Sequence, residues 1–165
     1  MRSTLSGLTI AVIFLASPMS AMAGTHKITS ATDVSSDATA PCPGLNPIEV
    51  SMVSMTSASV VGGNDATSIS VTLGGTVSSS DIAMVTVYYG GTLVNYVESP
   101  DIGSPLAIQL SGTQRGGPDW LVRVQLKDTA AGKTFSLTVN SIAGTNNAFL
   151  PFSTATRNAG TPTCE

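Results

Sequence analysis

The segment from Asp119 to Ile142 constrains the fold more than any other part of the chain, because apolar and polar residues alternate along it twice. The apolar face of the first run consists of Trp120, Val122, Val124 and Leu126. The apolar face of the second run consists of Phe135, Leu137 and Val139. A period of two is typical of a β-strand with one buried and one exposed face. Because a short polar segment with Gly132 separates the runs, the sequence predicts two strands paired as a β-hairpin.

Further short runs of apolar residues precede this segment, beginning at Ile48, with turn-forming residues between them. The chain is rich in β-branched residues and shows no amphipathic helical pattern after residue 23. About seven short strands separated by turn signals are typical of a sandwich of two sheets. We therefore expect an all-β fold, an immunoglobulin-like antiparallel β-sandwich of about seven strands over residues 48–143, with extended N- and C-terminal arms.

The first of these strands contains a change in the phase of its apolar residues. Val50 and Met52 lie on one face, and Val53 and Met55 then continue the apolar pattern one residue out of phase. One extra residue that reverses the facing is typical of a β-bulge. We expect the strand to switch sheets at this point.

The N-terminus has the composition of a secretory signal peptide over residues 1–23. Arg2 supplies a positive charge, residues 8–16 are apolar, and Ala21-Met22-Ala23 matches a cleavage signal. The apolar core is too short to span a membrane. We expect a mature chain that begins at Gly24, has no membrane span, and is secreted to the extracellular space or the bacterial cell surface.

The charge of the chain disfavours a polyanionic partner. The sequence has 7 Lys and Arg against 10 Asp and Glu, a net charge of −3, and no basic run. Proteins that bind nucleic acid depend on clustered positive charge to neutralise phosphates. Binding to nucleic acid is therefore not expected.

Segments of low apolar content flank the predicted sandwich. Residues 24–47 form a Ser/Thr/Pro-rich arm and hinge, which is interpreted either as a flexible leader or as a strand added to a neighbouring subunit. Residues 144–165 form a tail with one apolar patch, Phe149-Leu150-Pro151-Phe152. This patch suggests an extra edge strand, because Pro151 is excluded from a central position in a sheet.

The chain has two cysteines, Cys42 and Cys164, one in each flanking segment. In an oxidising compartment an even pair is expected to form one disulfide. Pairing within the chain would connect the hinge to the tail, whereas pairing between chains would link subunits of an assembly. The sequence leaves both alternatives open.

The only histidine, His26, is close to the expected mature terminus. An amine at Gly24, the amides of Thr25 and His26 and the imidazole form a candidate square-planar site for Cu(II) or Ni(II). The alternative is a chance histidine near a terminus. A lone histidine in a leader is poorly placed to act as a catalytic base, so we predict no catalytic residues, no enzymatic activity and no cofactor.

Tyr88, Tyr89 and Tyr96 cluster around Gly90-Gly91, a dipeptide typical of a two-residue hairpin turn. Exposed tyrosines here would make a binding patch, whereas the alternative is cross-strand pairing within the hairpin.

Aspartates also occur in the predicted loops. They suggest a Ca²⁺ site, against the alternative of solvated turn carboxylates, and they are Asp65, Asp81, Asp101, Asp119 and Asp128.

The segment DWLVRVQLKDTAAGKTFSLTVNSI resembles the last two strands of bacterial immunoglobulin-like and fibronectin type III-like surface modules. The resemblance implies adhesion, assembly or scaffold work. The expected function is that of a secreted, non-enzymatic structural or adhesive protein, a self-assembling extracellular fibre or surface subunit that uses edge-strand or arm exchange. Its expected partners are further copies of itself, surface glycans or other extracellular proteins. The alternative is a monomeric carbohydrate- or Ca²⁺-binding accessory domain.

Overall fold

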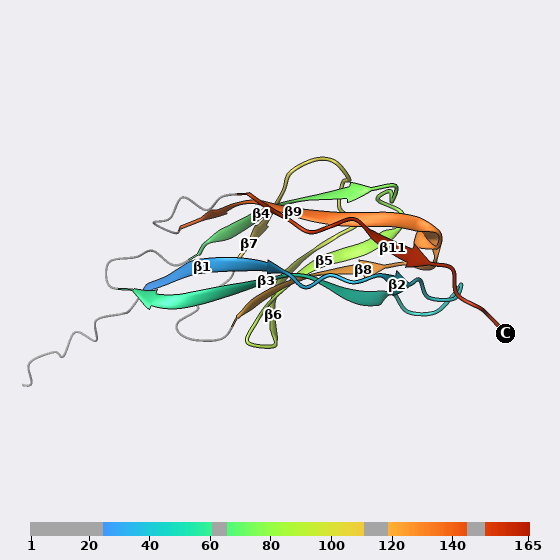
Figure 1. The fold of residues 1–165 in the computed structure, drawn as a ribbon, viewed down its shortest axis with the longest axis horizontal. Helices are drawn as coiled ribbons and strands as arrows, with labels where there is room; N and C mark the ends of the chain where they lie inside the picture. The colour runs from blue at the N-terminus through green and yellow to red at the C-terminus, as the bar shows by residue number, and fades with distance from the viewer. Residues whose placement is uncertain (1–24, 61–65, 111–118, 145–150) are drawn as a thin grey trace, which may run out of the picture.

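The chain folds into two β-sheets that pack face to face (Figure 1). This computed structural model describes residues 25–60, 66–110, 119–144 and 151–165, and describes side chains there except at 25–27 and 58–60. The predicted signal peptide lies outside the described residues. Sheet A has the strand order β1-β3-β8-β5-β6, and sheet B has the order β2-β11-β9-β4-β7 with β10 also paired to β9. The predicted all-β sandwich is confirmed.

The seven strands expected between residues 48 and 143 are present. They are β3 (Ile48–Val60), β4 (Ser68–Gly75), β5 (Ile82–Tyr89), β6 (Thr92–Glu98), β7 (Leu106–Gln109), β8 (Trp120–Leu126) and β9 (Lys133–Ala143). The flanking segments add β1 (Thr25–Asp33), β2 (Ala38–Thr39), β10 (Phe152–Ser153) and β11 (Arg157–Gly160). The only helix among the described residues is a 3₁₀ turn, η1 (Asp128–Ala130), so none there has the length to cross a bilayer.

The core lies between the sheets and is built from the alternating residues. Trp120 on β8 is 2% exposed and Phe135 on β9 is 1% exposed. Their alternate neighbours along both strands are also buried, while Arg123 and Gln125 lie on the outer side. The two runs therefore contribute to the same core from opposite sheets.

The predicted hairpin between these runs is wrong. β8 pairs with β3 and β5 in sheet A, whereas β9 pairs with β4 in sheet B. The connection crosses the end of the sandwich through η1, where Ala130 is fully buried. A period of two identifies a strand and its buried face, but it carries no information on which strand lies beside it.

The predicted bulge in β3 is confirmed. The register between β3 and β8 shifts between Ser51 and Val53, and Met52 and Val53 are both fully buried. The expected sheet switch does not occur, because β3 stays in sheet A and pairs with β1 along its other part. The bulge instead lets two consecutive side chains enter the core from one strand.

The Gly90-Gly91 turn is also confirmed. Gly90 and Gly91 have φ angles of 56° and 81°, and they connect the paired strands β5 and β6. Two consecutive positive φ angles are typical of the tight turn that joins two antiparallel strands.

The flexible-leader interpretation is wrong for the described part of residues 24–47. β1 pairs antiparallel with β3 at the edge of sheet A, and β2 pairs parallel with β11 in sheet B. The chain therefore crosses from one sheet to the other between Asp33 and Ala38. Ile28 contributes to the core, which explains how a segment with few apolar residues is held in the fold.

The C-terminal tail completes sheet B. β10 pairs with β9, and β11 lies between β9 and β2. Cys42 and Cys164 form a disulfide within the chain, with their Cα atoms 5.8 Å apart. The C-terminus lies at the end of the sandwich that holds β2 and β11 (Figure 1). The disulfide prediction is confirmed in its intramolecular form.

Candidate functional site

The outer surface of sheet A combines an ion pair, a cation–π contact and exposed apolar side chains. The pairing of β3, β8, β5 and β6 arranges its residues in three rows across the strands. The rows are Ser54–Leu121–Tyr88–Leu93, Ser51–Arg123–Thr86–Tyr96 and Glu49–Gln125–Met84–Glu98. We call these twelve residues the sheet A face.

Glu49 organises the polar centre of the sheet A face. Its Oε2 accepts a hydrogen bond from Arg123 NH1 at 2.6 Å, which is also an ion pair. Its Oε1 accepts hydrogen bonds from Thr86 Oγ1 at 3.0 Å and from Tyr88 OH at 3.1 Å. The Arg123 guanidinium lies 4.4 Å from the centroid of the Tyr88 ring, a cation–π contact. Four side chains from three strands are thus held in fixed positions.

The electrostatics of this cluster follow from the contacts. Burial alone would raise the pKa of Glu49, but the hydrogen bonds from Arg123, Thr86 and Tyr88 lower it overall. Burial, together with the bond to Glu49, raises the pKa of Tyr88. Glu49 is therefore a carboxylate and Tyr88 a neutral phenol at neutral pH, and the charges of Glu49 and Arg123 cancel.

The structure separates the three predicted tyrosines. Tyr88 and Tyr96 lie on the sheet A face, and Tyr96 is 47% exposed. Tyr89 lies on the opposite side, where its ring packs against Trp120 with the centroids 4.7 Å apart. Tyr88 and Tyr96 therefore share a face with Leu93, Tyr89 does not, and the binding role of the tyrosines stays a prediction.

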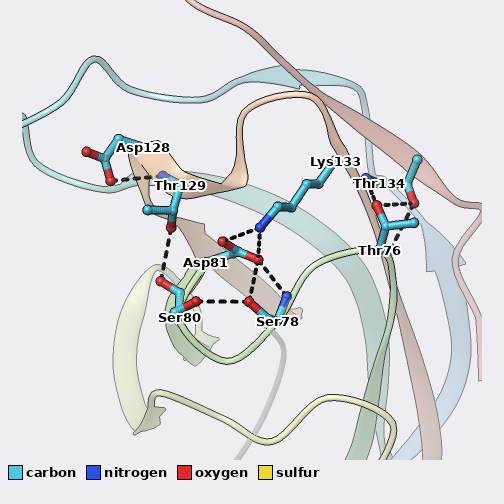
Figure 2. Close-up of polar contacts among 8 residues, drawn as sticks. All are labelled: Thr76, Ser78, Ser80, Asp81, Asp128, Thr129, Lys133 and Thr134. Carbon is cyan, nitrogen blue, oxygen red and sulfur yellow. Dashed lines mark hydrogen bonds and ion pairs between the residues drawn. The ribbon is translucent and has the colours of Figure 1, made fainter.

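A second polar cluster joins loops at one end of the sandwich (Figure 2). Lys133 Nζ contacts Oδ1 and Oδ2 of Asp81 at 2.8 and 2.7 Å. Ser78 donates to Asp81 Oδ2 from its backbone N at 2.6 Å and from its hydroxyl at 2.7 Å. Burial alone would raise the pKa of Asp81, but these bonds lower it to about 2. Every oxygen of this carboxylate is occupied by a donor from the protein, which is typical of a structural role.

A third cluster connects the two flanking segments. Asp33 Oδ1 accepts from the backbone N of Ser35 at 2.8 Å and from its hydroxyl at 2.5 Å. Asp33 Oδ2 accepts from Ala155 N at 2.9 Å and Arg157 NH2 at 3.2 Å. Burial would raise the pKa of Asp33, but the bonds from Ser35, Ala155 and Arg157 lower it.

Asp37 makes the next connection along the same segments. Its two carboxylate oxygens accept from Asn158 N at 2.7 Å and Asn158 Nδ2 at 3.1 Å. Ala40 N then donates to Gly160 O at 3.0 Å, and the disulfide follows. We call these contacts, from Asp33 to the Cys42–Cys164 disulfide, the terminal clasp.

The two predicted metal sites have different outcomes. Gly24 and the side chains of Thr25 and His26 lie outside the described residues, so the Cu(II) or Ni(II) site stays a prediction. The backbone of Thr25 and His26 is paired in β1 with Val60 and Ser59.

For Ca²⁺, the described residues contain no group of three or more acidic, His or Cys side chains able to hold a metal. Asp81 is committed to Lys133, and Asp65 lies outside the described residues.

A scan against protein-family models finds no match for this chain, and no curated protein matches it. The structure is therefore the basis of the functional proposal.

Sequence reasoning did not find the Glu49–Arg123 pair. The two residues are 74 positions apart and meet only because β3 lies beside β8. The available signal was weak: each is a charged residue on the outward face of a predicted strand. Tyr88 and Tyr96 were found because they flank a recognisable turn.

Proposed function

We propose that this protein is a secreted, non-enzymatic structural or adhesive subunit of a bacterial surface that assembles by exchange of β1 between copies. The observation that carries the proposal is the position of β1 at the edge of sheet A, where β3 is its neighbour. An edge strand presents unpaired backbone groups and is a general site for strand addition.

The attachment of β1 is compatible with exchange. Among its residues with described side chains, Ile28 belongs to the core and Ala31 packs against it, while Thr29, Ser30 and Thr32 are exposed. Most of the attachment is therefore the ladder of backbone pairing to β3. A β1 from a second copy would form the same ladder on β3, because exchange of identical elements recreates the same interface.

The terminal clasp defines where exchange would begin. β2 is fixed by its pairing to β11 and by the disulfide at Cys42. The segment between Asp33 and Ala38 is the hinge, and the contacts of Asp33 with Ala155 and Arg157 would have to open or re-form in trans. In the described part of the chain, the carboxylates of Asp33, Glu49 and Asp81 each accept hydrogen bonds from groups of the same chain. This supports a structural role for the three clusters.

The proposal is tested by size-exclusion chromatography and negative-stain imaging of the secreted protein over a range of concentrations. We expect oligomers or fibres that grow with concentration. Removal of residues 25–33 should abolish them, and an added peptide of residues 25–33 should shorten them by occupying β3. A matched peptide with Ile28→Asp should have no effect. A strictly monomeric protein at millimolar concentration would overturn the proposal.

A further inference from the structure

The sheet A face carries an exposed apolar pair that a regular strand would not produce. Leu93 is 45% exposed and Tyr96 is 47% exposed, and both lie on β6. Residues three positions apart on a regular strand point to opposite faces. The register shifts between Val87 and Tyr88, which pair with Asn95 and Leu93, so Val94 is the extra residue of a bulge. The bulge turns Leu93 and Tyr96 to the same outer face, a common use of bulges at binding sites.

Beside this pair lies the preorganised polar centre. In the described structure, Arg123 NH1 donates to Glu49, while Arg123 Nε is buried without a hydrogen-bond partner and so cannot donate to a ligand on the surface. The Glu49 side chain is 23% exposed and the Arg123 side chain 31% exposed, so both remain accessible from solvent. A carboxylate and a guanidinium held side by side offer acceptors and donors in fixed directions.

The area and the charge of the sheet A face indicate which class of ligand it can bind. Four strands about 4.8 Å apart and three rows about 6.8 Å apart cover on the order of 400 Å². A stable protein interface needs about 800 Å² on each partner, so the face is too small for one. The Glu49–Arg123 pair is neutral, which gives no selection for an anionic polymer.

We propose that the sheet A face binds a neutral carbohydrate chain over one or two sugar units. The apolar face of a sugar ring stacks on Tyr96 and Leu93, because the C–H bonds of the ring are attracted to the negative face of an aromatic ring. The hydroxyls at the edge of the ring exchange hydrogen bonds with Arg123 and Glu49. The proposal supplies a ligand for the adhesive part of the proposed function, and does not depend on β1 exchange.

The outer face of sheet B is the matched control within the same molecule. Its hydroxyl and amide groups bond to one another, as Asn140 Nδ2 does to Thr72 Oγ1 at 2.9 Å and as the hydroxyls of Thr138 and Ser153 do at 2.9 Å. Among the described residues it has no exposed large apolar side chain. Thr72→Ala therefore changes a sheet surface without touching the proposed site.

The test is retention of the monomeric fraction on insoluble cellulose, chitin and a β-1,3-glucan, with heparin–agarose and bare agarose as controls. We expect retention on at least one neutral polysaccharide. Tyr96→Ala should reduce it about tenfold, Tyr96→Phe should preserve it, and Thr72→Ala should leave it unchanged. Retention on none of the neutral polysaccharides, retention on heparin alone, or equal binding by Tyr96→Ala would overturn the proposal. None of these results would alter the size distribution that tests β1 exchange.

Discussion

The ammonium of Lys133 contacts both carboxylate oxygens of Asp81, a residue that is fully buried at the end of the sandwich. Lys133 begins β9 in sheet B, and Asp81 precedes β5 in sheet A. The pair therefore joins the two sheets where the connection between β8 and β9 crosses the core. This crossing replaces the hairpin that the sequence pattern predicts.

Replacing Asp81 with Asn should destabilise the protein by about 2–3 kcal/mol, because it removes the ion pair and weakens the acceptor for Ser78. Lys133 is 37% exposed and can return to water, which limits the loss. The measurement is urea-induced unfolding at pH 7. Asp128→Asn, a change in the adjacent turn, should cost less than about 0.5 kcal/mol. Equal effects of the two substitutions would contradict the assigned role.

The lowered pKa of Asp81 predicts that the protein loses unfolding free energy in acid. The pKa of Asp81 falls from an ordinary value of 3.8 to about 2 in the fold, so the folded state favours the ionised form. Its contribution is complete above about pH 4 and is lost as the pH falls towards 2. The difference in unfolding free energy between the wild type and Asp81→Asn should therefore shrink across this window. A difference that is as large at pH 2 as at pH 7 would count against the mechanism.

The terminal clasp should depend on its disulfide. Cys42 and Cys164 are separated by 122 residues, and replacing both with Ser should destabilise the protein by about 2–4 kcal/mol. Hydrogen exchange should quicken first in β2 and β11, which are short and lie next to the disulfide. Thermal unfolding and exchange rates of the double variant measure both effects. Unchanged exchange in β11 would show that its pairing to β9 is sufficient.

Gly75 should tolerate no side chain. It has a φ of 106°, and a Cβ there would overlap the carbonyl oxygen of Thr134 and lie 2.9 Å from the Cα of Phe135. Gly75→Ala should cost about 3 kcal/mol or more, because backbone atoms cannot move aside. Gly103→Ala is the matched control, since φ is 78° but no atom lies within 4 Å, and it should cost about 1 kcal/mol. Similar losses for both would mean that φ alone determines the cost.

The sequence allowed the strands to be located because burial on one face imposes a period of two, as in Trp120 to Leu126. It also revealed the β3 bulge and the Gly90-Gly91 turn, which are local signals. It did not reveal that β8 and β9 enter different sheets, because partner choice depends on contacts distant in the sequence. For β1 the sequence left a flexible leader and a strand added to a neighbouring subunit both open, because its attachment is mainly backbone pairing, which side-chain patterns do not record.

The residues of the candidate site were also predicted only where the signal was local. Tyr88 and Tyr96 were predicted from their positions around one turn, and they share a face. Tyr89 was grouped with them, but it directly follows Tyr88 on β5, so its side chain points to the opposite face and packs against Trp120. The Glu49–Arg123 pair needed the structure, because it depends on β3 lying beside β8.

Exchange of β1 between copies can be detected by a disulfide cross-link between positions that pair in β1 and β3. Thr32 and Ser54 are partners in the β1–β3 register, and facing positions in an antiparallel pair are close enough for a disulfide. Thr32→Cys with Ser54→Cys should give covalent multimers on a non-reducing gel of the assembled protein, since β1 of one copy then pairs with β3 of another. Each single variant should give dimers at most. Only internally cross-linked monomers under assembly conditions would contradict the account.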